Sequence, residues 1–261
     1  MTVPAPVLIM AGGTGGHVFP ALAVASALRE RSESVIWLGT EKGLEARVVP
    51  ADDFPLELVR VAGLRRKGFL SLVVAPFKLF FAVWAALQVM RRHRPKVVLG
   101  MGGFASGPGG FAAWLLRRPL VIHEQNAAAG LTNRLLARVA SDVLQAFPHA
   151  FSAKVAVRTI GNPVRSDIFS LAAPDVRISA EPGPLRLLVL GGSQGALALN
   201  ETVPQAIRLL HNAGMNVDVW HQSGASTFEA AECAYGEAGV SARIEPFIEA
   251  MNGAYGWADL V

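Results

Sequence analysis

Cysteine is nearly absent from this sequence of 261 residues, and Cys233 is the single example. One cysteine excludes a disulfide framework and fits a reducing compartment, and the Cys and His spacing of a zinc site is missing as well. The most apolar segment, residues 69–94, is interrupted by Pro76 and Lys78. Its unbroken piece, residues 79–87, is far shorter than the roughly 20 residues that a bilayer-spanning helix needs. No basic residues precede the short apolar run near the N-terminus, so we do not expect a secretion signal.

Acidic residues are missing from a long middle stretch. No Asp or Glu lies between Glu57 and Glu124, whereas that stretch holds 11 Lys and Arg. Residues 1–170 contain 20 basic against 10 acidic residues, and residues 171–261 contain 4 against 10, so the net charge of +4 hides a strongly basic first part. Such a one-sided field predicts a polyanionic partner, either nucleic acid or anionic lipid.

Glycine is plentiful at one place near the N-terminus, where four of the residues 12–16 are glycine. They follow an apolar run at 7–10, which predicts a strand, and precede residues 18–28, which predict a helix. Glycine lets the backbone approach another group closely, and the free N–H groups at a helix start favour an anion such as phosphate. His17 lies where a proton-accepting group would meet that ligand. The alternative is a plain tight turn with a surface histidine.

The glycine spacing also argues against two common nucleotide-binding motifs. Val18 stands where a Gly-x-Gly-x-x-Gly pattern would need glycine, and no Gly-Lys-Ser/Thr follows as in a Walker A loop. The sequence therefore gives little support to a nicotinamide cofactor or to an ATPase.

Apolar runs and helical segments alternate along the chain. The runs predict strands at 7–10, 34–39, 56–61, 97–100, 119–123, 143–145 and 157–160, with helices at 18–28, 44–49, 69–94, 111–116 and 131–139. This alternation is typical of an α/β protein with a parallel, doubly wound sheet, in which ligands bind at the carboxyl ends of the strands. Strand, glycine turn and helix then begin again at residues 185–213, which predicts a second domain. We place the domains at 1–165 and 185–261, with a linker at 166–184, and expect the second domain to be incomplete.

Large aromatic residues recur at helical spacing within 69–94. They form one stripe of Phe77, Phe80, Phe81 and Trp84. Basic residues flank the stripe on both sides: Arg65, Arg66 and Lys67 before it, and Arg91, Arg92, Arg94 and Lys96 after it. This combination describes a surface that enters a bilayer interface and holds anionic headgroups, and an ordinary buried crossover helix is the alternative. Nucleic-acid binding is less favoured, because the aromatics alternate with aliphatic and not with basic residues.

Five motifs occur in a fixed order: GGTGGH at 12–17, GGFASGP at 102–108, HEQN at 123–126, GNPVR at 161–165 and GGSQG at 191–195. In this order they resemble the motifs of the MurG family, which belongs to the GT-B nucleotide-sugar glycosyltransferases. The resemblance covers nearly the whole chain. It implies two Rossmann-like parallel-sheet domains with a cleft between them. It also implies an inverting transfer of GlcNAc from UDP-GlcNAc to the C4 hydroxyl of MurNAc in undecaprenyl-pyrophosphoryl-MurNAc-pentapeptide (lipid I), which gives lipid II for peptidoglycan.

The transfer needs a base near the acceptor hydroxyl, and the resemblance implies further residues that contact the two substrates. His17 is the expected base or donor to the acceptor diphosphate, and Glu124 is the alternative base, with a structural carboxylate as its simpler interpretation. The donor would be held by Thr14, Gly15, Gly16, Asn126, Arg165, Ser193 and Ile248, although core packing alone could explain Ile248. The acceptor or lipid would be met by Gly103, Arg65, Lys67, Phe77, Phe81 and Trp84, although the basic ones among these could simply be solvated.

The partners implied are UDP-GlcNAc, lipid I, anionic membrane lipids and a cell-wall synthesis complex, with no nucleic acid. The implied location is the cytoplasmic face of the bacterial inner membrane, and the implied processes include cell shape and cell division. No Asp-x-Asp pair occurs in the chain, so we expect neither a bound catalytic metal nor a cofactor. The alternatives are an inactive fragment, another UDP-sugar enzyme of this architecture such as an epimerase, and a non-enzymatic binding module.

Overall fold

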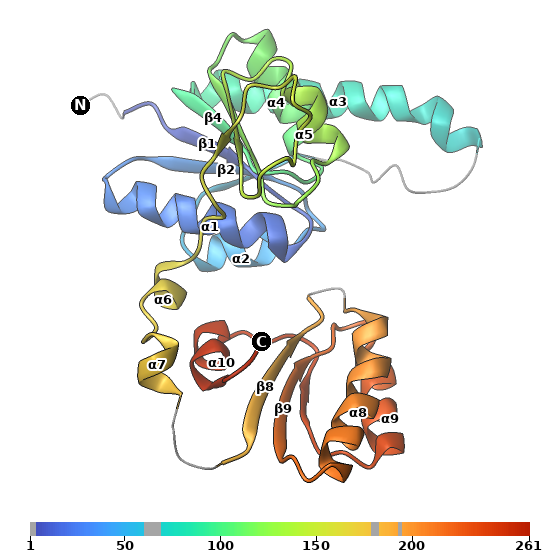
Figure 1. Ribbon diagram of the computed structural model, residues 1–261. Helices are drawn as coiled ribbons and strands as arrows, with labels where there is room; N and C mark the ends of the chain where they lie inside the picture. The colour runs from blue at the N-terminus through green and yellow to red at the C-terminus, as the bar shows by residue number, and fades with distance from the viewer. Residues whose placement is uncertain (1–3, 60–68, 179–182, 193–194) are drawn as a thin grey trace. The chain divides into compact units, whose positions relative to one another are not determined.

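The computed structural model describes residues 4–59, 69–178, 183–192 and 195–261, without side chains at 69–75. The chain forms two compact units, Met1–Arg165 and Ser166–Val261 (Figure 1). The division falls at the predicted end of the first domain. The segment predicted as a linker contains two short helices of the second unit, α6 (Ser166–Phe169) and α7 (Pro174–Arg177).

The first unit is built on a seven-stranded sheet in the order β3-β2-β1-β4-β5-β6-β7, and every pairing is parallel. The strands are β1 (Val7–Met10), β2 (Val35–Gly39), β3 (Leu56–Leu58), β4 (Val97–Gly100), β5 (Leu120–Glu124), β6 (Asp142–Gln145) and β7 (Arg158–Thr159). The order reverses between β1 and β4, which lie side by side. In a doubly wound sheet, this reversal is where ligands bind.

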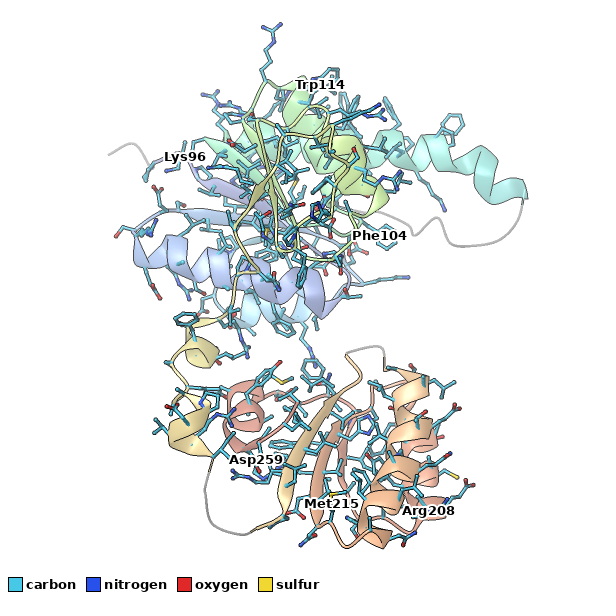
Figure 2. All side chains as sticks on the ribbon, in the orientation of Figure 1. Lys96, Phe104, Trp114, Arg208, Met215 and Asp259 are labelled. Carbon is cyan, nitrogen blue, oxygen red and sulfur yellow. The ribbon has the colours of Figure 1, made fainter. Side chains whose placement is uncertain are left out.

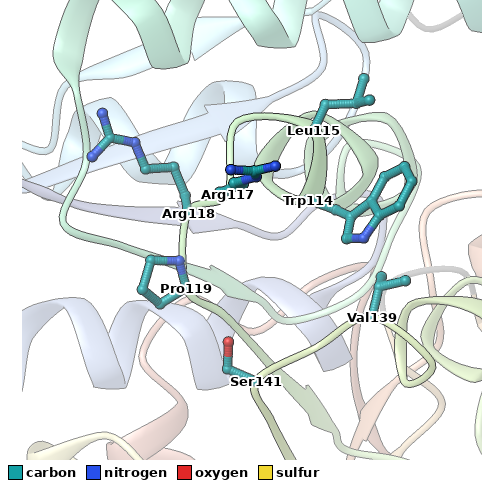
Figure 3. Close-up of a pocket in the computed structure, with 7 residues that line it drawn as sticks. All are labelled: Trp114, Leu115, Arg117, Arg118, Pro119, Val139 and Ser141. Carbon is teal, nitrogen blue, oxygen red and sulfur yellow. The ribbon is translucent and has the colours of Figure 1, made fainter.

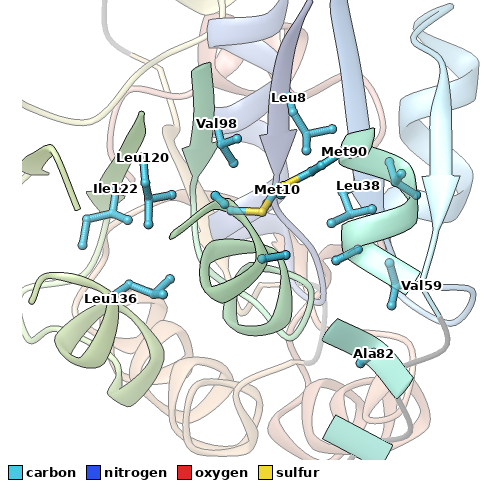
Figure 4. Packing of buried hydrophobic residues seen from close by; sticks show 14 of the residues in the cluster. Leu8, Met10, Leu38, Val59, Ala82, Met90, Val98, Leu120, Ile122 and Leu136 are labelled. Atoms are coloured by element: carbon cyan, nitrogen blue, oxygen red, sulfur yellow. The ribbon is translucent and has the colours of Figure 1, made fainter. Parts of the chain in front are cut away.

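Helices cover both faces of this sheet, because its buried strands are apolar on both sides. The helices are α1 (Gly15–Glu30), α2 (Glu45–Ala51), α3 (Phe69–His93), α4 (Ser106–Leu115) and α5 (Leu131–Leu136). Leu8, Met10 and Leu38 face a core formed with α3, α4 and α5, where Met90 is fully buried (Figure 4). The alternating residues Ile9 and Trp37 face a second core formed with α1 and α2.

Helix α4 begins five residues earlier than its predicted start at residue 111. Its glycines indicate a loop from sequence alone, but they serve close packing of the helix on the sheet. A Cβ atom on Gly109 would lie 2.2 Å from the Met10 sulfur, and one on Gly110 would lie 2.6 Å from the Leu136 side chain. The smallest residue is therefore required here inside a helix, in spite of its low helix propensity.

The second unit has a three-stranded parallel sheet in the order β10-β9-β8. Its strands are β8 (Leu185–Leu190), β9 (Val217–Gln222) and β10 (Arg243–Glu245), and its further helices are α8 (Leu197–Asn212), α9 (Phe228–Ala238) and α10 (Met251–Trp257). A parallel bridge joins Leu187 to Leu260 on the free side of β8. The same corner holds an ion pair between Arg186 and Asp259, at 2.6 Å.

Candidate active site

The first glycine loop connects β1 to α1 at the reversal of strand order. Gly13 has φ +93°, a conformation that favours glycine. Thr14 is the N-cap of α1, but its exposed side chain makes no capping hydrogen bond. Gly16 has open space where a side chain would lie, so neither packing nor backbone conformation explains this glycine. A group that approaches the helix start from outside would explain it.

A buried carboxylate supports this loop from within the unit. Glu45, on α2, is fully buried and accepts the Gly13 N–H at 2.8 Å. Its other oxygen accepts the Thr40 N–H at 2.9 Å and the Thr40 hydroxyl at 2.7 Å. The Gly13 N–H is therefore already engaged, and the His17 N–H donates to the Thr14 carbonyl oxygen at 3.1 Å. The loop remains open to a ligand at residues 14–16 and at the His17 side chain.

The second glycine loop, after β4, packs directly on the first. Gly103 has φ +84°, and a Cβ atom there would lie 2.1 Å from the Gly12 carbonyl oxygen. The Ser106 hydroxyl, at the start of α4, lies 2.9 Å from the Met10 carbonyl oxygen and 2.7 Å from that of Gly102. These contacts join the ends of β1 and β4, so the two loops form one surface. Close packing suffices to explain Gly103, and its predicted contact with the acceptor remains a prediction.

His17 is half-buried in the first turn of α1, against the second loop. A Cβ atom on Gly102 would lie 2.6 Å from the His17 Nδ1 atom, so the imidazole ring rests on bare backbone. The same Nδ1 atom lies 3.1 Å from Oε1 of Gln125, which follows β5. Three strand ends, those of β1, β4 and β5, therefore converge on His17.

Glu124 has both carboxylate oxygens engaged by neighbouring donors. Oε1 accepts the N–H and the side-chain amide of Asn126, at 3.0 and 2.8 Å. Oε2 accepts the Gly130 N–H at 3.1 Å and the Asn133 side-chain amide at 2.9 Å. Burial raises the pKa of the carboxyl group, but these hydrogen bonds outweigh it and hold the pKa of Glu124 below its usual value. This setting favours the structural role over that of a base.

Asn126 is exposed, and Glu124 fixes the orientation of its side chain. Because the Asn126 amide nitrogen donates to Glu124, the amide oxygen is left to accept a hydrogen bond from outside. An outward acceptor of this kind suits a sugar hydroxyl. The predicted role of Asn126 near the donor sugar is compatible with this geometry and remains a prediction.

Arg165 comes close to the first glycine loop through α1. Its guanidinium carbon lies 5.4 Å from the centre of the Phe19 ring, two residues after His17. His123, which ends β5, anchors the chain leading to Arg165, because its Nε2 atom lies 3.0 Å from the Gly161 carbonyl oxygen. Burial lowers the pKa of His123, so this histidine is a neutral structural donor.

The predicted donor residues of the second unit are described in part. Ser193 lies outside the described residues. Gly195 has φ +78°, and a Cβ atom there would lie 2.3 Å from the Ser223 carbonyl oxygen, so the loop after β8 packs against the loop after β9. The Ile248 side chain is buried in the core with Leu188 and Trp220, and its N–H donates to Oε1 of Gln222 at 2.9 Å, which leaves its carbonyl oxygen for a ligand. Its contact with uracil remains a prediction.

The aromatic stripe on α3 is exposed, and the half of the helix that carries it projects beyond the sheet (Figure 1). Phe77 and Phe81 are each 65% exposed and Trp84 is 49% exposed. Phe80 packs on Phe81 and Trp84. The alternative of a buried crossover helix describes the other face of α3, where Ala82, Ala86 and Met90 are in the core. The predicted contacts Arg65 and Lys67 lie outside the described residues.

A hollow of about 460 Å³ lies at the opposite end of the sheet from the glycine loops (Figure 3). Its lining comes from the segments around the starts of β5 and β6 and the end of α4: Trp114, Leu115, Arg117, Arg118, Pro119, Val139 and Ser141. Phe104, in the second glycine loop just before α4, and Trp114, in the last turn of α4, lie at opposite ends of this helix (Figure 2). The hollow is therefore not part of the His17 site.

The sequence alone does not predict a role for two residues of the site. Glu45 was not singled out because one glutamate in a short helix is ordinary, although the glycines 12, 39 and 43 that surround it could have suggested a buried group. Gln125 was noted only as part of the HEQN motif. No group of three or more metal-ligating side chains is found in the part of the chain that the structure describes.

The chain matches the glycosyltransferase family 28 N-terminal domain over residues 7–145 and the glycosyltransferase family 28 C-terminal domain over residues 186–261. It therefore belongs to glycosyltransferase family 28, and the predicted GT-B fold class is confirmed.

Two relatives of known name are similar to this chain over nearly its whole length. The chain is 58% identical over 255 residues to the UDP-N-acetylglucosamine–N-acetylmuramyl-(pentapeptide) pyrophosphoryl-undecaprenol N-acetylglucosamine transferase of Alkalilimnicola ehrlichii, a match that covers 98% of this chain and 71% of that protein. It is similar to the crystal structure of Acinetobacter baumannii MurG, with a TM-score of 0.73 and 39% identity over 98% of this chain and 72% of that one. The predicted resemblance to the MurG family is confirmed.

A more distant structure shows the fold alone. UDP-GlcNAc 2-epimerase from Neisseria meningitidis has a TM-score of 0.58 but only 11% identity, over 96% of this chain and 74% of that one. Its likeness therefore carries no information on the reaction.

Proposed function

We propose that this chain transfers GlcNAc from UDP-GlcNAc to the C4 hydroxyl of MurNAc in lipid I, which gives lipid II. The observation that carries the proposal is the 58% identity to a transferase of that name, and the meeting of the ends of β1, β4 and β5 around His17 supports it. The sequence relatives favour this reaction over the alternative of an epimerase.

The reaction needs a proton acceptor near the attacking hydroxyl. The acceptor oxygen forms a bond to C1 of GlcNAc, the bond from C1 to the diphosphate oxygen breaks, and UDP leaves with that electron pair. The hydroxyl proton must move to a base as its oxygen becomes a nucleophile. His17 suits this role better than Glu124. The half-buried His17 ring has one described hydrogen-bond partner, at Nδ1, whereas each carboxylate oxygen of Glu124 already accepts two hydrogen bonds.

The donor sugar then lies over the start of α1. The exposed Thr14 and the open space at Gly16 support this position, with Gly15 between them and the outward oxygen of Asn126 nearby on the β5 loop. Arg165 supplies positive charge for the diphosphate. Ser193 and the main chain of Ile248 are assigned to the nucleotide from the second unit by family resemblance alone.

The transfer itself is the direct test. Labelled UDP-GlcNAc and a short-chain lipid I analogue are incubated with the chain, and also with the chain extended by the remaining segment of the Alkalilimnicola relative. We expect product, and a loss of about a hundredfold or more in kcat for His17→Ala. His149→Asn, a change at an exposed histidine of the first unit outside the site, is the control and should leave kcat unchanged. Absence of product from both forms would overturn the assignment.

We further propose that the first unit binds the membrane surface through α3. In the described part of the chain, no helix combines the length and apolar character that crossing a bilayer requires. The exposed rings of Phe77, Phe81 and Trp84 suit shallow insertion, and the exposed Arg91 and Arg92 in the last turn of the same helix add positive charge. The corresponding location is the cytoplasmic face of the inner membrane, where a cell-wall synthesis complex would be a further partner.

Sedimentation with phosphatidylglycerol vesicles tests this contact. Fully burying one such side chain is worth about 1.5–3 kcal/mol, so replacing Phe77, Phe81 and Trp84 together by Ser should weaken binding at least about tenfold. Leu209→Ser is the matched control, because Leu209 is 66% exposed on α8 of the second unit. Equal binding by the triple variant and the control would contradict the proposal.

A further inference from the structure

The one described hydrogen-bond partner of the His17 side chain is Gln125, which follows β5. The Gln125 side chain is only 6% exposed, and its Oε1 atom lies 3.1 Å from Nδ1 of His17. A carbonyl oxygen can only accept a hydrogen bond, so Nδ1 of His17 must carry the proton in this contact. In a neutral imidazole, the lone pair is then on Nε2.

The direction of the Gln125 amide therefore decides which ring nitrogen is the base. A reversed amide would present its NH₂ group to His17, and Nδ1 would hold the lone pair instead. In that state the proton-accepting nitrogen would face Gln125 and the backbone of Gly102, away from any substrate.

Met101 provides a reason for the observed direction. Its buried sulfur lies 3.8 Å from the Gln125 amide nitrogen. A thioether sulfur has no proton and is a weak acceptor, so it favours the NH₂ group and gives nothing to the oxygen. Met101, Gln125 and His17 thus form a chain of contacts from the buried end of β4 to the open side of α1.

We propose that Gln125 is a positioning residue that holds His17 in the Nδ1–H tautomer, with Nε2 directed to the acceptor hydroxyl. This inference rests on the proposed function. As the hydroxyl proton moves to Nε2, the Gln125 carbonyl dipole also stabilises the charged imidazolium ring. A neutral amide achieves this without placing a second negative charge beside a diphosphate substrate, as an Asp or Glu would.

Nitrogen NMR of the ¹⁵N-histidine-labelled chain reads the tautomer directly, because protonated and unprotonated ring nitrogens have well-separated shifts. The His17 signals are assigned by their loss in His17→Ala. We expect Nδ1–H in the native chain and in Gln125→Glu, whose carboxylate also accepts from Nδ1. In Gln125→Leu we expect the Nε2–H form to become populated, with an unchanged unfolding midpoint as the check on folding.

Kinetics on the same variants give the second readout. We expect kcat to fall about 10- to 100-fold in Gln125→Leu with little change in the KM for UDP-GlcNAc, because only the proton transfer is affected. Gln125→Glu should recover most of kcat but raise that KM through charge repulsion. Met101→Leu, which conserves volume, should lower kcat by a few-fold.

The outcomes separate this inference from the proposed function. An Nε2–H tautomer in the native chain, or a tautomer unaltered in Gln125→Leu, would overturn the role of Gln125 even if transfer depends on His17. The expected tautomers without any transfer by the native or extended chain would overturn the proposed reaction and leave the positioning contact in place.

Discussion

Glu124 is a single residue whose carboxylate, although close to the site, stabilises the loop after β5 through hydrogen bonds. Its two oxygens accept four hydrogen bonds, from Asn126, Gly130 and Asn133. In Glu124→Gln an NH₂ group replaces one of the two carboxylate oxygens. The two N–H groups that donated to that oxygen then face another donor and lose their acceptor. We expect a loss of about 2–3 kcal/mol in unfolding free energy, together with a higher KM for UDP-GlcNAc because Asn126 is released.

The alternative role makes the opposite prediction for the same variant. If Glu124 were the base, Glu124→Gln would lower kcat about a hundredfold and leave the urea midpoint near that of the native chain. Urea unfolding and initial rates, measured side by side with His17→Ala, distinguish the two outcomes.

At the scale of elements, the contact between the two glycine loops joins β1 to β4. In Gly103→Ala the new methyl group would overlap the Gly12 backbone, and φ +84° is strained for alanine. We expect a loss of at least about 2 kcal/mol in unfolding free energy and a fall in transfer rate. Gly107→Ala, within α4, is the matched control, since its Cβ atom would make an ordinary contact of 3.5 Å with Thr132 of α5. An unchanged stability of Gly103→Ala, with a raised KM for lipid I, would instead support direct contact with the acceptor.

Much of this element-scale picture was predictable from the sequence, for physical reasons. Apolar runs that lead into glycine turns predict parallel strands whose carboxyl ends lie at one edge of the sheet, as observed. The helical spacing of Phe77, Phe81 and Trp84 predicts one aromatic stripe, and these three side chains are exposed. The early start of α4 was missed, because glycine at 107, 109 and 110 is equally compatible with a loop until the neighbours are known. Glu45 and Gln125 were missed because the contacts that join them to the site, with Gly13 and His17, link residues 32 and 108 positions apart in sequence.

At the scale of the molecule, buried histidines make stability depend on pH. His221 on β9 is fully buried with its Nδ1 atom 3.0 Å from the Tyr235 hydroxyl, and desolvation lowers its pKa from 6.5 to about 4. Desolvation lowers the pKa of His123 in the first unit as well. Between pH 6.5 and 4 the unfolded chain binds protons that the native chain does not, so stability falls as the pH falls.

The size of this effect follows from the shift at His221, which corresponds to about 2 kcal/mol lost at pH 5. In His221→Asn the amide can still reach the Tyr235 hydroxyl but does not titrate, so its urea midpoint should depend less on pH. Parallel midpoint curves for the native chain and the variant between pH 7 and 5 would contradict this origin of the pH dependence.

The surroundings of Glu45 have a consequence for how this protein can diverge. A methyl group on Gly12, Gly39 or Gly43 would lie 2.4, 2.6 or 1.9 Å from an atom of the Glu45 side chain. A larger residue therefore fits at any of these three glycine positions only after Glu45 has been replaced by a smaller residue. If Glu45 is replaced first, the Gly13 and Thr40 N–H groups lose their acceptor. The four positions are mutually dependent, because a single substitution at a glycine or at the glutamate is destabilising. We therefore expect natural variants to keep this group intact or to replace it as a whole.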